Sequence, residues 1–220
     1  MWRDAWLVAA KDLRVEARAK VALRQILPFA LTVLVLFAFA LDPSRLPALS
    51  AGLMWVAVLL CAVLAVQRSF AMESSGPTLD GLRLFGLDPA GVFLGKAAAL
   101  AVQLLLLEAL LAGGVVVLYG ASLHGGLVLA GAGLAATAGL ACAGCVYGAL
   151  AGGGRSADTL LPVLFLPVVS PVLLGATKAW EAALAGTPGQ GEPWLRLLAV
   201  FAVVYAALGA LAFGPVLEEA

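Results

Sequence analysis

Few residues of this chain could catalyse a reaction, and their spacing matches no catalytic motif. His124 is the one histidine, so a Ser/His/Asp triad or a histidine-based metal site is not expected. A haem-ligand role for His124 is less expected than an ordinary solvated position in a short polar loop. The segment 91–97 (Gly-Val-Phe-Leu-Gly-Lys-Ala) has one residue too few between its glycines, and alanine where a phosphate loop needs Ser or Thr. We therefore expect a chain that is not an enzyme and has no ATP site of its own.

Three cysteines and one glutamate fall within apolar segments. Cys142 and Cys145 have the spacing of a redox motif, but they lie inside an apolar run, so we expect them to pack like Cys61. Glu108 is the one ionisable residue deep within such a run. In lipid this residue type is costly and usually faces a bundle interior or a cavity. Glu108 either makes a polar contact between helices or stays protonated near one membrane face.

The composition determines which elements carry these residues. Hydrophobic residues make up 63% of the 220 residues and charged residues 12%, against roughly 45–50% and about 25% in soluble proteins. Only the lipid bilayer can accommodate so much apolar surface, and the apolar runs lack the alternation of a β-barrel. The zero net charge and the lack of a long basic block argue against nucleic-acid binding. We expect an all-α membrane protein with a single transmembrane domain over residues 1–220.

Charged residues divide the chain into six apolar segments, each long enough to cross a bilayer. The predicted spans lie near 25–41, 47–67, 94–118, 127–150, 159–177 and 196–216. The fifth is short and contains Pro162, Pro167 and Pro171, so five spans with a re-entrant segment are an alternative. Residues 178–193, which include Trp180, predict a short amphipathic helix on the outer side.

Small residues recur every four positions in the fourth predicted span. Gly144, Gly148 and Gly152 form such a stripe, which allows a neighbouring backbone to approach closely. We expect this span to be buried among other helices.

The distribution of basic residues predicts the orientation of the spans. Ten of the thirteen lysines and arginines fall on one side, which should be cytoplasmic. Both termini then lie inside the cell, in a multi-pass protein of the inner membrane. The charged first 24 residues do not resemble a cleaved signal peptide, so the first span should remain as an anchor. The ten residues are Arg3, Lys11, Arg14, Arg18, Lys20, Arg24, Arg68, Arg83, Lys96 and Arg155.

Residues 2–20 are predicted to form an amphipathic helix in the membrane interface. Its apolar face comprises Trp2, Trp6, Ala9, Leu13 and Ala17. The helix is either a simple topology anchor or an elbow that frames a cytoplasmic docking surface.

The longest predicted cytoplasmic loop, residues 68–93, contains a candidate coupling element. Thr78 can cap a short helix whose Leu79, Leu82 and Phe85 recur every three residues. Its apolar face is covered either by the protein's own helix ends and the lipid surface, or by a groove on a soluble partner. The residues assigned to coupling with a partner ATPase are Thr78, Leu79, Leu82, Arg83, Phe85, Leu87, Asp88 and Pro89.

The predicted architecture and several short segments resemble a known family. An interfacial helix, six spans and a helix in the first long cytoplasmic loop resemble the permeases of ABC-2-type exporters. Within that class the chain is similar to the CcmB family, haem exporter protein B of cytochrome c maturation. The similar segments are 52–57 (Gly-Leu-Met-Trp-Val-Ala), 67–70 (Gln-Arg-Ser-Phe), Glu73, 81–84 (Gly-Leu-Arg-Leu), 88–89 (Asp-Pro), 94–96 (Leu-Gly-Lys) and 160–171 (Leu-Leu-Pro-Val-Leu-Phe-Leu-Pro-Val-Val-Ser-Pro).

This resemblance implies a function for the chain. Members of the family pair with the ATPase subunit CcmA and work with the membrane proteins CcmC and CcmD. ATP hydrolysis there is linked to release of the haem-loaded chaperone CcmE from CcmC. By resemblance, this chain binds no cofactor directly, ATP is bound by the partner, haem is handled by the complex, and two copies of the chain are present.

Two other functions remain open at the level of sequence. A generic ABC-2-type permease for lipid, drug or polysaccharide would share the architecture, although segments 52–57 and 67–70 argue against it. A membrane-embedded enzyme would need a polar cluster at one depth, where only Glu108 qualifies.

Overall fold

The computed structural model describes residues 1–74, 88–121, 124–151 and 157–219, and these residues form helices and short connections without a strand. The helices are α1 (Trp2–Ala19), the π-helical η1 (Ala22–Ile26), α2 (Leu27–Ala40), α3 (Leu46–Ser74), α5 (Pro89–Tyr119), α6 (Gly126–Leu150), α7 (Ala157–Leu184), the 3₁₀ turn η2 (Pro188–Gln190) and α8 (Glu192–Glu219).

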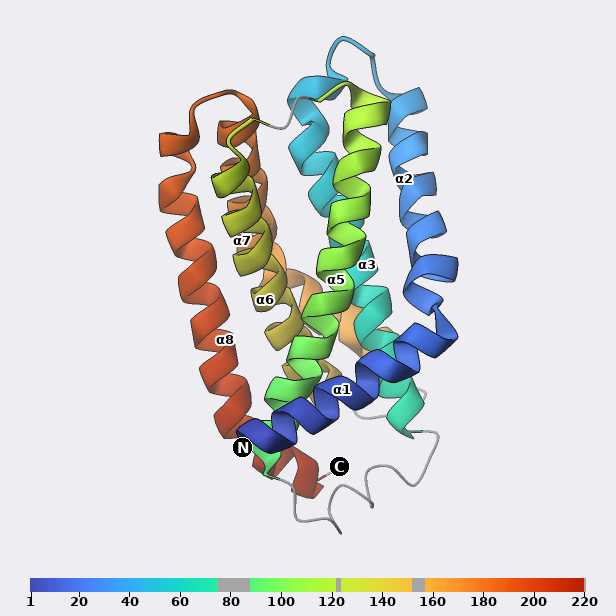
Figure 1. The fold of residues 1–220 in the computed structure, drawn as a ribbon, viewed down its shortest axis with the longest axis vertical. Coiled ribbons are helices and arrows are strands. Elements are labelled where there is room, and N and C mark those ends of the chain that lie inside the picture. The colour runs from blue at the N-terminus through green and yellow to red at the C-terminus, as the bar shows by residue number, and fades with distance from the viewer. Residues whose placement is uncertain (75–87, 122–123, 152–156, 220) are drawn as a thin grey trace.

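Six helical segments are long and apolar enough to cross a membrane, which confirms the predicted all-α membrane protein. They run side by side as a bundle, with both chain termini at one end (Figure 1). The segments are Ala22–Ala40, Leu46–Ala71, Pro89–Tyr119, Gly126–Leu150, Leu160–Leu184 and Pro188–Pro215.

Helix α5 begins five residues before the predicted third span, because its first turn carries strong start signals. The Asp88 carboxylate accepts a hydrogen bond from the N–H of Ala90 at 3.3 Å, and Pro89 occupies the first turn. At the other end Gly120 adopts a left-handed conformation with φ 64° and ends the helix. Since α3 also continues to Ser74, the predicted loop 68–93 is helical at both of its ends.

Helix α7 is continuous for 28 residues despite its three prolines, so the re-entrant alternative is not what the structure adopts. The Ser170 hydroxyl donates to the carbonyl of Pro167 at 2.8 Å. The outer amphipathic helix predicted for residues 178–193 is wrong. Its first seven residues continue α7, because Trp180 and Ala183 are buried in the bundle while Lys178 and Glu181 pair at its exposed edge.

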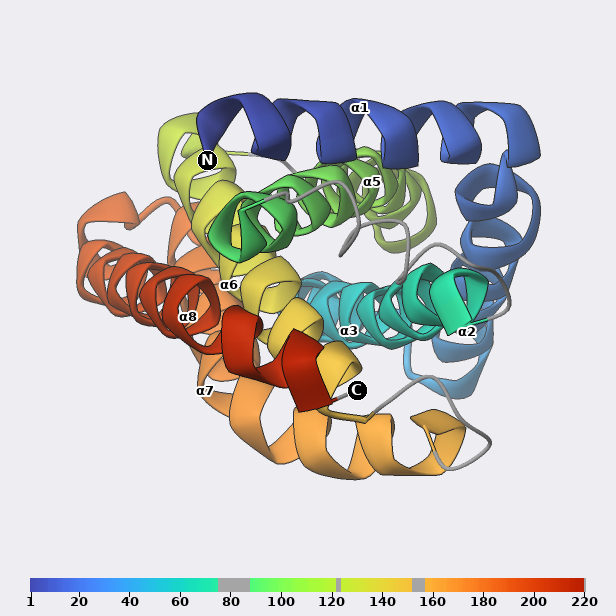
Figure 2. The same cartoon turned by 90° about the horizontal axis from the view of Figure 1, so that it is seen from below.

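Helix α6 lies inside the bundle and contacts α3, α5, α7 and α8 (Figure 2). The space beside its glycines is filled by large side chains of neighbouring helices. Gly144 faces Val66 and Gly148 faces Phe70, both from α3. Gly152 lies outside the described residues. In these contacts the glycine stripe brings α3 against α6.

Helix α1 lies across the end of the bundle that holds both termini and runs along α5 (Figures 1 and 2). Ala5 and Val8 are buried, whereas Trp2 and Trp6 are exposed and remain available to the membrane interface. The helix ends at Lys20, a non-glycine residue with φ 53°. One face of α1 therefore packs on the protein, and the two tryptophans lie outside that contact.

Candidate functional site

Glu108 is buried at the contact between α5 and α6. The Thr137 hydroxyl of α6 donates a hydrogen bond to its Oε2 atom at 2.7 Å. A β-carbon on Gly133, one turn before Thr137, would overlap Oε1 of the same carboxylate. The absence of a side chain at Gly133 therefore makes room for the carboxyl group, and Thr137 orients it.

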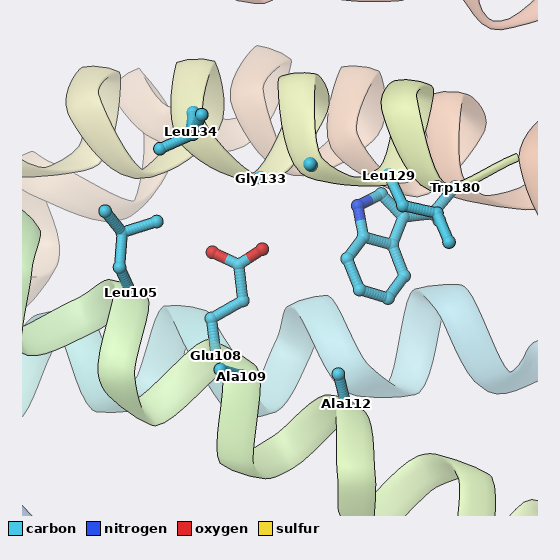
Figure 3. Close-up of a pocket in the computed structure, with 10 residues that line it drawn as sticks. Leu105, Glu108, Ala109, Ala112, Leu129, Gly133, Leu134 and Trp180 are labelled. Atoms are coloured by element: carbon cyan, nitrogen blue, oxygen red, sulfur yellow. The ribbon is translucent and has the colours of Figure 1, made fainter. Parts of the chain in front are cut away.

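A pocket of about 530 Å³ opens beside this carboxylate, between α5 and α6. Figure 3 shows Glu108 extending from α5 toward Gly133, with Trp180 from α7 on the same side. The lining residues are Leu105, Glu108, Ala109, Ala112, Gly126, Leu129, Ala130, Gly133, Leu134 and Trp180. The pocket is thus an apolar groove with two groups able to form hydrogen bonds, a carboxyl and an indole N–H.

The indole of Trp180 is also held by an aromatic contact. Its ring meets Trp55 of α3 edge to face, with centroids 5.9 Å apart. Its Nε1 atom is buried and has no hydrogen-bond partner among the described residues. Figure 3 shows this nitrogen on the ring edge nearest to Gly133. A buried N–H donor without a partner is uncommon in proteins.

A second cluster joins α1 to the start of α5 at the opposite end of α5 from Gly120. A β-carbon on Gly95 would lie 2.8 Å from Cβ of Val8, and one on Gly91 would lie 2.7 Å from the carbonyl oxygen of Met1. These glycines belong to the segment that fails as a phosphate loop. In the structure they let α1 pack closely on α5.

Lys96 is buried at this junction between α1 and α5. The residue is only 1% exposed, and its Nζ atom lies 3.8 Å from Oδ2 of Asp12 on α1. The same ammonium lies 4.7 Å from the ring centroid of Phe70 on α3, a cation–π distance. One buried cation therefore connects α1, α3 and α5.

The same junction includes Asp88, the residue that caps the start of α5. The N–H of Asp88 donates to the Asp4 carboxylate of α1 at 3.5 Å. The pKa of Asp4 is lowered, mainly by a hydrogen bond from the amino group of Met1 and further by the N–H of Asp88. Of the residues assigned to ATPase coupling, Asp88 and Pro89 are therefore beside α1, whereas Thr78, Leu79, Leu82, Arg83, Phe85 and Leu87 lie outside the described residues.

The other candidate residues are separate from both clusters. His124 is exposed in the turn between α5 and α6, and Cys61, Cys142 and Cys145 are buried thiols in α3 and α6. Within the described residues, no three His, Cys, Asp or Glu side chains are placed to hold a metal ion.

Sequence reasoning found Glu108 but missed the residues around it and the role of Lys96. Thr137 is the only serine or threonine between Gly126 and Leu150, which was a usable signal. Gly133 lies outside the i, i+4 stripe of Gly144 and Gly148, and Trp180 fell in a segment predicted to form a separate amphipathic helix on the outer side. Lys96 was considered as a topological charge, in a segment that fails as a phosphate loop and in a segment similar to the family, but not as a buried cation.

The fold and these two clusters define a multi-pass helical membrane protein in which α5 runs from its junction with α1 to an apolar groove that contains Glu108. The family model described as CcmB protein matches residues 3–219. Heme exporter protein B of Pseudomonas aeruginosa is 30% identical over 204 residues, 90% of each chain. The proteins of the same name from Haemophilus influenzae and Paracoccus denitrificans are 29% identical over 191 residues and 30% identical over 208 residues. These alignments cover 84% and 92% of this chain, and 85% and 92% of the relatives. The chain therefore belongs to the CcmB family, as its resemblance predicted.

Proposed function

We propose that this chain is the membrane subunit of a haem-exporting ABC-type system, and that a partner ATPase supplies the energy. The CcmB match over residues 3–219, together with six helices able to span a membrane, carries this proposal. The relatives are named heme exporter protein B. In this proposal the chain is not catalytic, and haem is cargo handled by the complex.

The start of α5 is suited to transmit movement from a partner into the membrane. The coupling loop ends at Asp88, which caps α5, and α5 continues without interruption for 31 residues, about 46 Å. Glu108 lies about 28 Å along this helix from Pro89. ATPase closure that displaces residues 78–89 would therefore tilt or shift α5 as one body and reach the groove at Glu108.

The proposed assembly follows from the family. A CcmA-like ATPase binds the coupling loop, CcmC-like and CcmD-like subunits lie in the same membrane, and a CcmE-like chaperone is released after ATP hydrolysis. A second copy of the chain is expected, because a pair of ATPase subunits needs two membrane halves. In this assembly the chain lies in the inner membrane with both termini in the cytoplasm.

Co-purification tests the coupling loop. Tagged chain extracted from its own membranes should bring down an ATPase, and Leu82→Asp or Phe85→Asp should lower the recovered ATPase at least tenfold, because a charge is placed on the apolar docking face. Ser75→Asp adds the same charge to the same loop outside that face and should have little effect. Unchanged recovery in the Leu82 and Phe85 variants would show that the loop does not dock the ATPase.

Haem staining of membrane proteins tests the pathway. Deletion of the chain should abolish mature c-type cytochromes, and the wild-type chain should restore them. Normal cytochromes in the deletion strain would exclude a role of the chain in the haem pathway. A generic export permease would then be the remaining function for this fold.

A further inference from the structure

Two polar groups at the groove, Oε1 of Glu108 and Nε1 of Trp180, have no hydrogen-bond partner among the described residues. Thr137 satisfies Oε2 of Glu108, and among the described residues it is the only hydrogen-bond donor to that carboxylate. Oε1 faces the space beside Gly133. Trp180 is 4% exposed, and its Nε1 atom has no partner in the described part of the chain. Within the described residues, the groove thus contains an unpaired carboxylate oxygen, and an unpaired indole N–H is buried in its wall.

The groove can be reached from the hydrocarbon of the membrane. Ala109, Ala130 and Leu134 line it and are exposed on the outer surface of α5 and α6. Glu108 lies within about 6 Å of the middle of α5, whereas lipid headgroups begin about 15 Å from the centre of the hydrocarbon core. A phospholipid therefore cannot bring its polar group to Glu108, and its acyl chains offer no hydrogen bond.

The walls of the groove have the form of a helix-docking surface. Ala109 and Ala112 on α5 face Gly126, Ala130 and Gly133 on α6 across the pocket. Small residues in transmembrane helices let another backbone approach closely. The lining runs over about 10–12 Å along each helix, which corresponds to two helical turns.

We propose that the groove is the docking site for a transmembrane helix of another chain, which inserts a hydroxyl or carboxamide side chain. A Ser, Thr, Asn or Gln side chain can both donate to a carboxylate and accept from an indole N–H. Such a group also complements Glu108 in either protonation state. The inference extends the proposed assembly to a membrane partner and does not depend on ATPase docking.

The exposed hydroxyl groups of a second copy of this chain are poorer occupants of the groove. Thr32 and Ser170 carry exposed hydroxyl groups in the described central part of the spans, but each already donates to a carbonyl of its own helix, those of Pro28 and Pro167. Neither hydroxyl has a hydrogen left for an ionised Glu108 carboxylate while those bonds are kept.

Site-specific photo-cross-linking in the native membrane tests this inference. The photo-reactive amino acid p-benzoylphenylalanine replaces Leu134 at the rim of the groove, and Leu208 on α8 is the matched control, since the two leucines are 56% and 51% exposed. We expect an adduct at position 134, but not at 208, with a membrane-spanning segment of another chain, identified by mass spectrometry. That segment should carry Ser, Thr, Asn or Gln at the depth of the cross-link, and its replacement by Ala should weaken the adduct.

Substitutions in the groove decide whether the two polar groups hold the partner. Glu108→Leu and Trp180→Phe should each lower the adduct about threefold to tenfold, the effect of one hydrogen bond between transmembrane helices. Glu108→Gln should retain it, because an amide also pairs with a hydroxyl or carboxamide. Recovery of the ATPase and the amount of chain in the membrane should stay normal, which separates loss of the partner from misfolding and from failure of the proposed function.

Three outcomes would overturn the inference. Adducts with lipid alone would show that the groove is an ordinary lipid contact. Adducts between differently tagged copies would assign it to a homodimer. An adduct that survives Glu108→Leu combined with Trp180→Phe, or that is lost in Glu108→Gln, would exclude recognition by a neutral hydrogen-bonding side chain.

Discussion

At the scale of single residues, the intramembrane carboxyl group depends on a missing side chain and one hydroxyl. Gly133 leaves the space that Oε1 of Glu108 occupies, and Thr137 donates to Oε2. Burial of a polar group in a membrane is tolerated when its hydrogen bonds are made inside the protein. Two small features of α6 therefore determine how Glu108 is accommodated on α5.

Replacement of Gly133 should reveal this close fit. Gly133→Ala places a methyl group against the carboxylate and should destabilise the protein by about 1–3 kcal/mol, as overpacking does elsewhere. Gly113→Ala is the control, because nothing lies within 4 Å of a β-carbon at that position on α5. Unfolding in mixed detergent micelles would measure both variants. Equal stability of the two would show that the carboxylate moves aside freely.

The Thr137 hydroxyl should contribute measurably to the stability of the contact between α5 and α6. Thr137→Val keeps the shape but removes the donor, and should cost about 0.6–2 kcal/mol, the range for hydrogen bonds between transmembrane helices. Thr137→Ser keeps the donor and should lie closer to the wild type. The same unfolding assay separates the two, and a serine variant as unstable as the valine variant would attribute the effect to the lost methyl group.

At the scale of helices, α1 is bound to the rest of the protein by close packing and by one buried cation. Gly91 and Gly95 allow α1 to approach α5, and Lys96 faces Asp12. Asp12 also pairs with the exposed Lys11 at 3.1 Å. Asp12 therefore takes part in one buried and one surface ion pair, and their contributions to stability can be compared.

Removal of the buried cation should loosen α1. Lys96→Met keeps the length of the side chain but leaves the Asp12 carboxylate with the exposed Lys11 in place of the buried cation, and should cost about 1–3 kcal/mol. Lys11→Met removes a surface pair and should cost at most about 1 kcal/mol. Stability in detergent and protease cleavage within α1 would measure both. Adding Asp12→Asn to Lys96→Met should recover part of the loss, and strictly additive effects would exclude the pairing.

The sequence predicted the positions of the helices better than the contacts between them. Charge spacing located apolar segments that overlap the six candidate spans, because a charged residue in hydrocarbon is costly wherever it occurs. It did not reveal that Trp180 continues α7 or that Lys96 is buried. Both depend on residues that are far away in sequence, Trp55 for one and Asp12 for the other. For the groove, the pattern identified Glu108 but not Gly133, because space between helices leaves no periodic trace along the chain.

At the scale of the whole molecule, the bundle has two distinct ends. One end holds both termini and α1, and the other holds the α2–α3 and α7–α8 connections (Figure 1). The excess of Lys and Arg on the first side predicts that it faces the cytoplasm.

Thiol labelling can test this orientation without removing the native cysteines, since all three are buried. A membrane-impermeant maleimide should label His124→Cys in intact spheroplasts, because position 124 is exposed at the outer end of α5. It should label Val15→Cys, exposed on α1, only after the membrane is permeabilised. The reverse pattern would invert the proposed topology and place the coupling loop on the wrong side for a cytoplasmic ATPase.

The length of α5 makes it a long lever between Asp88 and Glu108. The groove at Glu108 lies near the middle of the helix, and Asp88 caps its start beside α1. If α5 pivots at the groove, a tilt of about 10° carries its tip through about 5 Å. In the proposed assembly, a large movement at the ATPase would become a small rotation of α5 at the groove, where the proposed partner helix would be gripped or released.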